Sequence, residues 1–179
     1  MIEIEMPDDA GLNQARQHFA ALSESRALLE GDGLPAIAAG RLYTHATTVA
    51  PAPDGELERA LEGNLSLRRA YRDFAAAAAS YRFGEVIAAS TDQIPPRHGV
   101  GCRISVELSR SEADQFIVIV ELDVTQKAAP ATLILCDPED RCHRFPLPQA
   151  HRGVIQFIVQ ADDPILPLLR DPGTEALLR

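Results

Sequence analysis

The chain has 179 residues, of which 46% are hydrophobic, and a formal net charge of −9 at pH 7. This length and apolar content predict a globular protein with its own core and exclude an intrinsically disordered chain. Acidic residues outnumber basic ones in both halves, which argues against a nucleic-acid surface and against binding to anionic membrane. We therefore expect another protein as the partner, and neither nucleic acid nor membrane.

Arginine supplies all the basic residues except Lys127. Together with the high alanine content, this bias indicates a GC-rich bacterial genome. No run reaches the roughly 18 apolar residues that a membrane span needs. Residues 1–5 lack the basic-then-apolar order of a signal peptide. The sequence thus predicts a cytoplasmic protein, whose three cysteines would be mostly reduced.

The first half of the chain is predicted to be helical. Apolar residues recur every three or four positions, and this pattern predicts helices at residues 12–29, 56–62 and 67–83, with a short helix or turn at 34–42. Asp54 is placed to cap the helix at 56–62, and Asn64 or Ser66 to cap the next one. Residues 44–55 and 91–101 contain prolines and are predicted to be a loop and a linker. These features predict a helical domain at residues 1–92.

The second half of the chain alternates between apolar runs and turn residues. Strands are predicted at residues 103–108, 115–122, 131–136, 142–147 and 153–159, with a short helix from Pro164 and a closing strand at 175–178. The strand at 115–122 is apolar on both faces in its first half, which predicts a central strand covered on both sides. Pro146 marks 142–147 as an edge strand. The predicted fold class is α+β: an N-terminal helical part followed by an antiparallel β-sandwich or partial barrel at 93–179.

The cysteines allow three interpretations. Cys136 and Cys142 are symmetric about a predicted hairpin turn and should face each other across two strands. They could form a disulfide in an oxidised or exported chain, or remain reduced thiols. With Cys102 and His143 they also form a candidate zinc site, although adjacent residues such as Cys142 and His143 point to opposite faces of a strand.

A second chemical candidate is the stretch from His98 to Cys102, which places an imidazole near a thiol beside glycines. A cysteine nucleophile needs its base within hydrogen-bond reach, and this spacing does not by itself provide it. The alternative is a loop leading into a strand. No Walker, Rossmann, G-x-S-x-G, H-E-x-x-H or C-x-x-C motif is present, and these absences lower the expectation of an enzyme.

One stretch resembles a known family. Residues 38–42 (AAGRL) and 58–71 (ERALEGNLSLRRAY) are similar to the helical segment of some bacterial anti-sigma factors, and the resemblance extends over residues 38–74. It implies that the helices grip a sigma factor through Leu61, Leu67, Tyr71 and Phe74. The chain departs from that family in lacking its H-x3-C-x2-C zinc signature and the transmembrane helix of its membrane-bound members.

We therefore predict a non-enzymatic bacterial regulatory or adaptor protein that acts by binding another protein and needs no cofactor. The edge strand at 142–147 offers a second binding surface, since it could accept a partner strand. The alternatives are an accessory subunit of an enzyme or assembly, and a small cysteine- or zinc-dependent enzyme.

Overall fold

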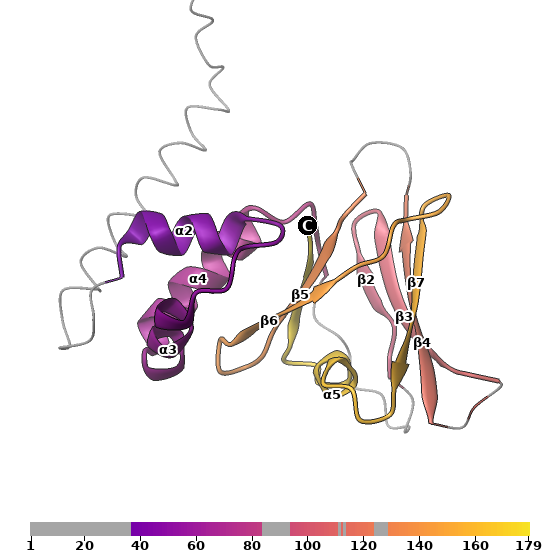
Figure 1. Ribbon diagram of the computed structural model, residues 1–179. Helices are drawn as coiled ribbons and strands as arrows, with labels where there is room; N and C mark the ends of the chain where they lie inside the picture. Colours follow the sequence, from indigo (N-terminus) through magenta and orange to yellow (C-terminus); the bar gives the residue numbers. More distant parts are fainter. Residues whose placement is uncertain (1–36, 84–93, 111, 113, 124–128) are drawn as a thin grey trace, which may run out of the picture.

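The computed structural model describes residues 37–83, 94–110, 112, 114–123 and 129–179. These residues form an α+β fold in which a group of helices, a first sheet and a second sheet follow one another as layers (Figure 1). The helices are α2 (Ala39–Thr47), α3 (Gly55–Gly63), α4 (Leu65–Ala77) and α5 (Ile165–Arg170). The predicted fold class is confirmed, and the helix predicted at 12–29 lies outside the described residues.

Both sheets are four-stranded and antiparallel. The inner sheet, next to the helices, has the order β1-β8-β5-β6, with β1 at Tyr81–Arg82, β8 at Glu175–Leu178, β5 at Thr132–Cys136 and β6 at Cys142–Pro146. The outer sheet has the order β2-β3-β4-β7, with β2 at Arg97–Gly99, β3 at Cys102–Leu108, β4 at Gln115–Leu122 and β7 at Val154–Gln160. Among the described residues, one bridge, between Phe83 and Gly99, joins the two sheets along one side, and the fold is a sandwich and not a closed barrel.

The main core lies between the two sheets. Alternating residues of β3, β4, β5 and β7 point into it, as the period-two pattern predicts. Helix α5 adds Ile165 and Leu169 to the same core, each only 1% exposed. A six-residue helix has little stability of its own, so this burial and its C-terminal contacts hold it in place. The guanidinium of Arg97 supplies those contacts by donating to carbonyls at the end of α5, including that of Leu169 at 3.0 Å.

The strand that is covered on both faces is β5, and the prediction for residues 115–122 is wrong in this respect. Every residue of β5 is buried, whereas only Val118 and Val120 of β4 are. The helices cover the inner sheet, and the residues of β4 that point away from the core lie on the outer face of the molecule. Which of the two sheets the helices pack against depends on tertiary packing, and the local hydrophobic pattern does not determine it.

The two predicted helix caps are present. Asp54 accepts the Leu57 N–H at 3.1 Å at the start of α3, and Asn64 accepts the Leu67 N–H at 3.1 Å at the start of α4. These bonds satisfy amide donors that have no partner within the helix. Helix α2 continues to Thr47, into the predicted loop.

Three short segments differ from the prediction. Helix α4 ends at Ala77, not near residue 83, because Tyr81 and Arg82 pair with β8 as strand β1. The predicted linker contains β2, which pairs with β3. Strand β1 of the inner sheet therefore lies within the range that was predicted to be helical. Strands of two and three residues are too short to leave a periodic signal in the sequence.

Candidate partner-binding site

The four helix residues assigned to a partner by the anti-sigma resemblance lie in the helical core. Leu67, Tyr71 and Phe74 are 2%, 4% and 3% exposed, and Leu61 packs against the same cluster. Their contacts include α2 and α3, with an edge-to-face ring pair of Phe74 with Tyr43, and Tyr71 also contacts Arg144 of β6. In this conformation Leu67, Tyr71 and Phe74 are buried and hold the helices together, whereas Leu61 is partly exposed.

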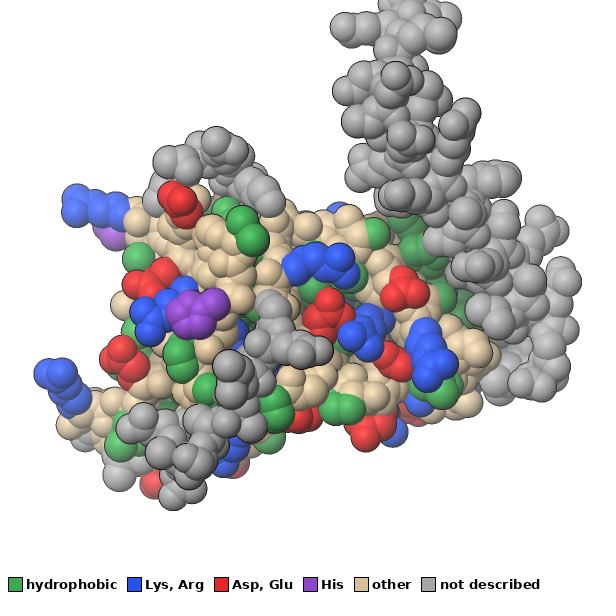
Figure 2. All heavy atoms as spheres, turned by 180° about the vertical axis from the view of Figure 1, so that it is seen from behind, with side chains coloured by type: hydrophobic (Ala, Val, Ile, Leu, Met, Phe, Trp, Pro, Cys, Tyr) green, Lys and Arg blue, Asp and Glu red, His purple; other side chains and the backbone are tan. Residues whose placement is uncertain are grey.

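Helix α4 rests on the inner sheet through small residues. Ala75 and Ala76 pack against Ile134 and Leu177, together with Cys136 of the disulfide described below. The alanines let the helix backbone approach the sheet closely. This apolar contact is small, and polar contacts surround it, with acidic and basic side chains intermingled over the junction between the helices and the sandwich (Figure 2). The helical part is thus attached to the sandwich by a mixed interface.

The hairpin between β5 and β6 provides one group of these polar contacts. Asp140, at its tip, adopts a positive φ of 63° and is 7% exposed. It accepts hydrogen bonds from Arg72 at 2.6 Å and Arg69 at 3.2 Å, both on α4. Burial alone would raise the pKa of Asp140, but the two arginines outweigh it and lower the pKa below its usual value. Arg72 also binds Glu175 of β8 at 2.7 Å, so one arginine links the helix to the β5–β6 turn and to β8.

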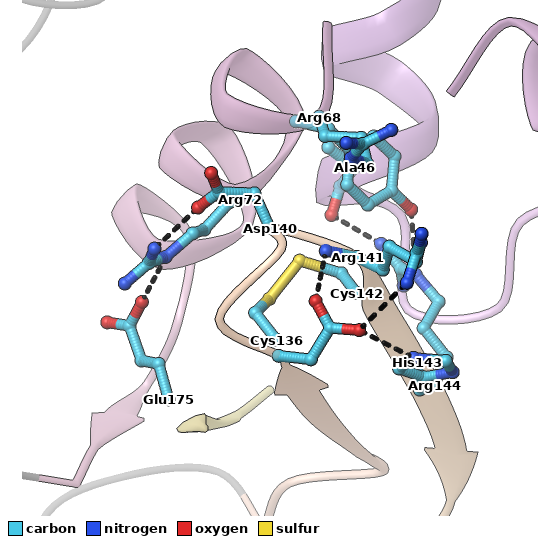
Figure 3. The surroundings of a disulfide bond; sticks show 12 residues. Ala46, Arg68, Arg72, Cys136, Asp140, Arg141, Cys142, His143, Arg144 and Glu175 are labelled. Carbon is cyan, nitrogen blue, oxygen red and sulfur yellow. Dashed lines mark hydrogen bonds and ion pairs between the residues drawn. A yellow bond between two sulfur atoms is a disulfide. The ribbon is translucent and has the colours of Figure 1, made fainter. Parts of the chain in front are cut away.

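A disulfide between Cys136 and Cys142 closes the base of this hairpin (Figure 3). The two residues are direct partners in the β5–β6 ladder, as their symmetry about the turn predicts. Of the three interpretations of the cysteines, the structure contains the disulfide. Their sulfur atoms are not thiolates in this state, so zinc binding by Cys136 and Cys142 would require reduction.

The remaining members of the zinc candidate lie apart from the disulfide. Cys102 is buried on β3 in the outer sheet, opposite Gly99. His143 aligns with Leu135 on the opposite face of β6 from Cys142, as expected for neighbouring strand residues. Among the described residues, no three or more His, Cys, Asp or Glu side chains are grouped to hold a metal ion.

The structure also separates the suggested cysteine nucleophile from its base. His98 lies on β2 opposite Arg103, one position out of step with the Gly99–Cys102 pair. Side chains at successive positions point to opposite faces of a sheet. The imidazole is exposed while Cys102 is buried, so this pair does not form a catalytic arrangement.

Arg144 on β6 fixes the junction between the sandwich and the helices. Its guanidinium donates to the carbonyl oxygens of His45, Ala46 and Thr48 at 3.0, 2.6 and 2.9 Å. These carbonyls belong to the last turn of α2, where the helix has no internal donors and its dipole favours a cation. The Nε of Arg144 donates to the Tyr71 hydroxyl on α4 at 3.0 Å. One strand residue therefore caps α2 and contacts α4.

His45 completes this network. Its Nδ1 lies 3.0 Å from the Tyr71 hydroxyl. Because the hydroxyl oxygen accepts from Arg144, its proton is available to a neutral imidazole, whose Nδ1 accepts it. Burial, and next the positive charge of Arg144, lower the pKa of His45. The fold thus favours the neutral form of this histidine.

A groove opens beside the network. It has a volume of about 430 Å³ and lies between the loop that follows α2 and the ends of β5 and β6. We call it the junction groove; its lining residues are His45, Val49, Ala50, Pro51, Pro53, Glu58, Ala131, Thr132, Arg144 and Pro146. Most of these side chains are apolar, and the polar groups stand at a few positions. Such a lining is typical of a binding site.

Arg41 holds the loop that forms one wall of the junction groove. It makes two hydrogen bonds to the Asp54 carboxylate, at 2.6 and 2.7 Å, and one to Glu56 at 2.9 Å. The Arg41 contacts, with the Leu57 N–H, lower the pKa of Asp54 to about 2. On the opposite wall, the Thr132 hydroxyl donates to the Val49 carbonyl at 2.8 Å. The loop is therefore anchored at both ends.

Comparison with protein-family models, with curated proteins and with solved structures gives no match to this chain. Helices long and apolar enough to cross a bilayer are absent from the described part of the chain.

His45, Arg144 and the loop from Val49 to Pro53 were not predicted to form one site. His45 was assigned to a loop, and the partners of the network lie 26 and 73 residues apart in the chain. The one available signal was the alternation of β6. Arg144 stands on the same face of that strand as Cys142, where an apolar residue would be expected on a covered face.

Proposed function

We propose that this protein is a non-enzymatic regulatory or adaptor protein that binds a partner protein in the junction groove. The observation that carries the proposal is the position of an open, largely apolar groove directly beside an edge strand. Val49, 41% exposed, and the prolines at positions 51 and 53 form its apolar wall. Strand β6 borders the opposite side and is the last strand of the inner sheet, as predicted from Pro146.

The backbone of β6 offers hydrogen bonds to an extended partner segment. The bonds from Asp137 N–H to the Arg141 carbonyl and from Leu147 N–H to the Ala131 carbonyl mark the positions that face β5. Alternation therefore directs the N–H and C=O groups of Cys142 and Arg144 away from the sheet. Pro146 falls in the same set, where its missing N–H costs the sheet no bond. A strand of the partner can add here by β-augmentation while its side chains enter the groove.

The anti-sigma resemblance stays a prediction. Leu67, Tyr71 and Phe74 could grip a sigma factor only if the helices separated, and Leu61 is partly exposed. The junction groove is accessible in the described conformation. An accessory subunit would use the same groove, and the identity of the captured protein distinguishes it from a regulator. A cytoplasmic location also stays a prediction, against which the disulfide counts, because cytosolic thiols are kept reduced.

Two matched substitutions test the groove. Val49→Arg places a charged side chain in it, and Val100→Arg makes the same change on the β2–β3 turn, where Val100 is 95% exposed. Tagged wild type and both variants are used to capture partners from the native host. We expect wild type and Val100→Arg to retain one stoichiometric protein and Val49→Arg to lose it. Equal capture by all three would overturn the proposal.

A further inference from the structure

Strand β7 forms one edge of the outer sheet and lacks the usual protection of an edge. It has seven residues, and none of them is charged, proline or glycine. Proteins usually guard such edges with short strands, charges or proline. The other sheet ends follow that rule: β1 and β2 have two and three residues, and β6 carries Arg144 and Pro146.

The backbone of β7 has outward-facing groups in its second half. Val154 exchanges two hydrogen bonds with His151, on the side away from β4. Alternation then directs the N–H and C=O groups of Gln156, Ile158 and Gln160 outward as well. Within the described part of the chain, the Gln160 carbonyl accepts from Asp163, and no backbone partner is present for Gln156 or Ile158.

The side chains of β7 favour pairing too. Ile158 is 63% exposed, on the outer face of the sheet. Its ladder partner on β4 is Ile117, which lies on the same face. Burying an exposed isoleucine that lies beside another apolar residue on an uncharged edge is energetically favourable.

We propose that β7 pairs antiparallel with β7 of a second copy of this chain, with the two-fold axis at Ile158. Each Ile158 then exchanges two backbone hydrogen bonds with Ile158 of the other copy, and Gln156 lies opposite Gln160. The His151 turn occupies the space beside Val154, so the contact is confined to the second half of the strand. The two outer sheets become one continuous eight-stranded sheet across the axis.

Charge complementarity selects a second copy as the occupant. The turn before β7 carries Arg152, and the turn after it carries Asp162, both exposed. An antiparallel pair places the basic turn of each copy beside the acidic turn of the other, whereas a parallel pair would place like charges together. A chain with a net charge of −9 repels its own copies, and an uncharged strand flanked by opposite charges is where that repulsion is least.

The test is the molar mass of the full chain by sedimentation equilibrium over a range of concentrations. Wild type is expected to be a dimer. Ile158→Lys places two cations together at the axis and should give a monomer, with an unchanged circular dichroism spectrum because the side chain is exposed. A wild type that stays monomeric at all concentrations, or an Ile158→Lys variant that stays dimeric, would overturn the proposal.

A charge exchange tests the orientation of the two strands. Arg152→Asp and Asp162→Arg, made separately, should each raise the dissociation constant at least about tenfold, because like charges then meet at both ends. The double variant should restore the affinity of wild type. A double variant no tighter than the single ones would contradict the antiparallel pairing, and a strand from another protein would then be the alternative occupant.

Discussion

Arg144 Nε donates to the Tyr71 hydroxyl at 3.0 Å, and this bond joins the edge strand of the sandwich to the centre of the helical core. The rest of the guanidinium caps α2. The guanidinium carbon also lies 5.7 Å from the centre of the Tyr71 ring, within the range of a cation–π contact. The Arg144 side chain thus connects the wall of the junction groove to two helices.

Replacing Arg144 should therefore destabilise the fold. Arg144→Ala removes four hydrogen bonds and the C-terminal cap of α2, and we expect the free energy of unfolding to fall by about 2 kcal/mol. Arg144 repels the nearby cation of Arg179, since burial and the charge of Arg144 both lower the pKa of Arg179. Removing this repulsion offsets part of the loss. Urea unfolding followed by circular dichroism measures the change.

The control for Arg144 is Arg141→Ala on the same hairpin. The Arg141 side chain is 56% exposed and lies 3.9 Å from Asp137, so its loss should change stability by less than about 0.5 kcal/mol. Tyr71→Phe completes a double-mutant cycle with Arg144→Ala. The loss of unfolding free energy in the double variant should be smaller than the sum of the losses in the two single variants. Equal losses in the two arginine variants would show that the cap is not important.

Acid should weaken the same network through His45. The folded-state pKa of His45 lies below its usual value of about 6.5, so the unfolded chain takes up the proton first as the pH falls. Its stabilising contribution is therefore complete above about pH 6.5 and is lost as the pH falls from there to the lower folded-state pKa. Unfolding of wild type and His45→Asn from pH 8 to pH 5 measures this difference. A difference that does not change with pH would contradict the assignment of a neutral His45.

Gly99 is required where the two sheets meet. A Cβ at this position would lie 2.5 Å from the Arg82 carbonyl oxygen and 2.7 Å from the Cys102 sulfur. Gly99→Ala should therefore cost about 1–3 kcal/mol of unfolding free energy. Gly40→Ala is the matched control, because nothing lies within 4 Å of its Cβ and alanine favours the helix, so it should leave stability unchanged or slightly higher. If both variants lost the same free energy of unfolding, the close contacts at Gly99 would not be the cause of the loss.

The disulfide should stabilise the hairpin that α4 grips. Closing a loop with a sequence separation of 6 residues is expected to contribute about 2 kcal/mol. Urea unfolding of wild type with and without a dithiol reductant measures it. The double variant C136A/C142A should resemble reduced wild type and show no response to the reductant. A wild-type midpoint that is the same with and without reductant would contradict this expectation.

The sequence predicted the elements that carry their own periodic signal. The strands from β3 to β8 are short apolar segments bounded by turn residues, of which β3 shows the clearest period-two alternation. Both helix caps follow from Asp54 and Asn64. Strands β1 and β2 were missed because two or three residues show no period. The burial of β5 on both faces depends on where the helices pack, and the residues of β5 do not specify this.

The candidate site was less predictable than the fold. Leu67, Tyr71 and Phe74 lie at helical spacing and are buried, but whether a helical stripe faces its own protein or a partner cannot be decided from spacing. The junction groove joins residues from α2, the loop after it, β5 and β6. Its defining contact, from Arg144 to α2, connects residues almost 100 positions apart, and a single sequence holds no local pattern for such a pair.

The most direct test of the proposed function is photo-crosslinking from the junction groove in the native host. A photoreactive phenylalanine analogue replaces Val49 in one variant and Val100 in another. We predict one discrete protein adduct from position 49 that position 100 does not give, and its loss when Ala131→Arg fills the groove from the opposite wall. No adduct from position 49, or the same adducts from both positions, would contradict partner binding in the groove.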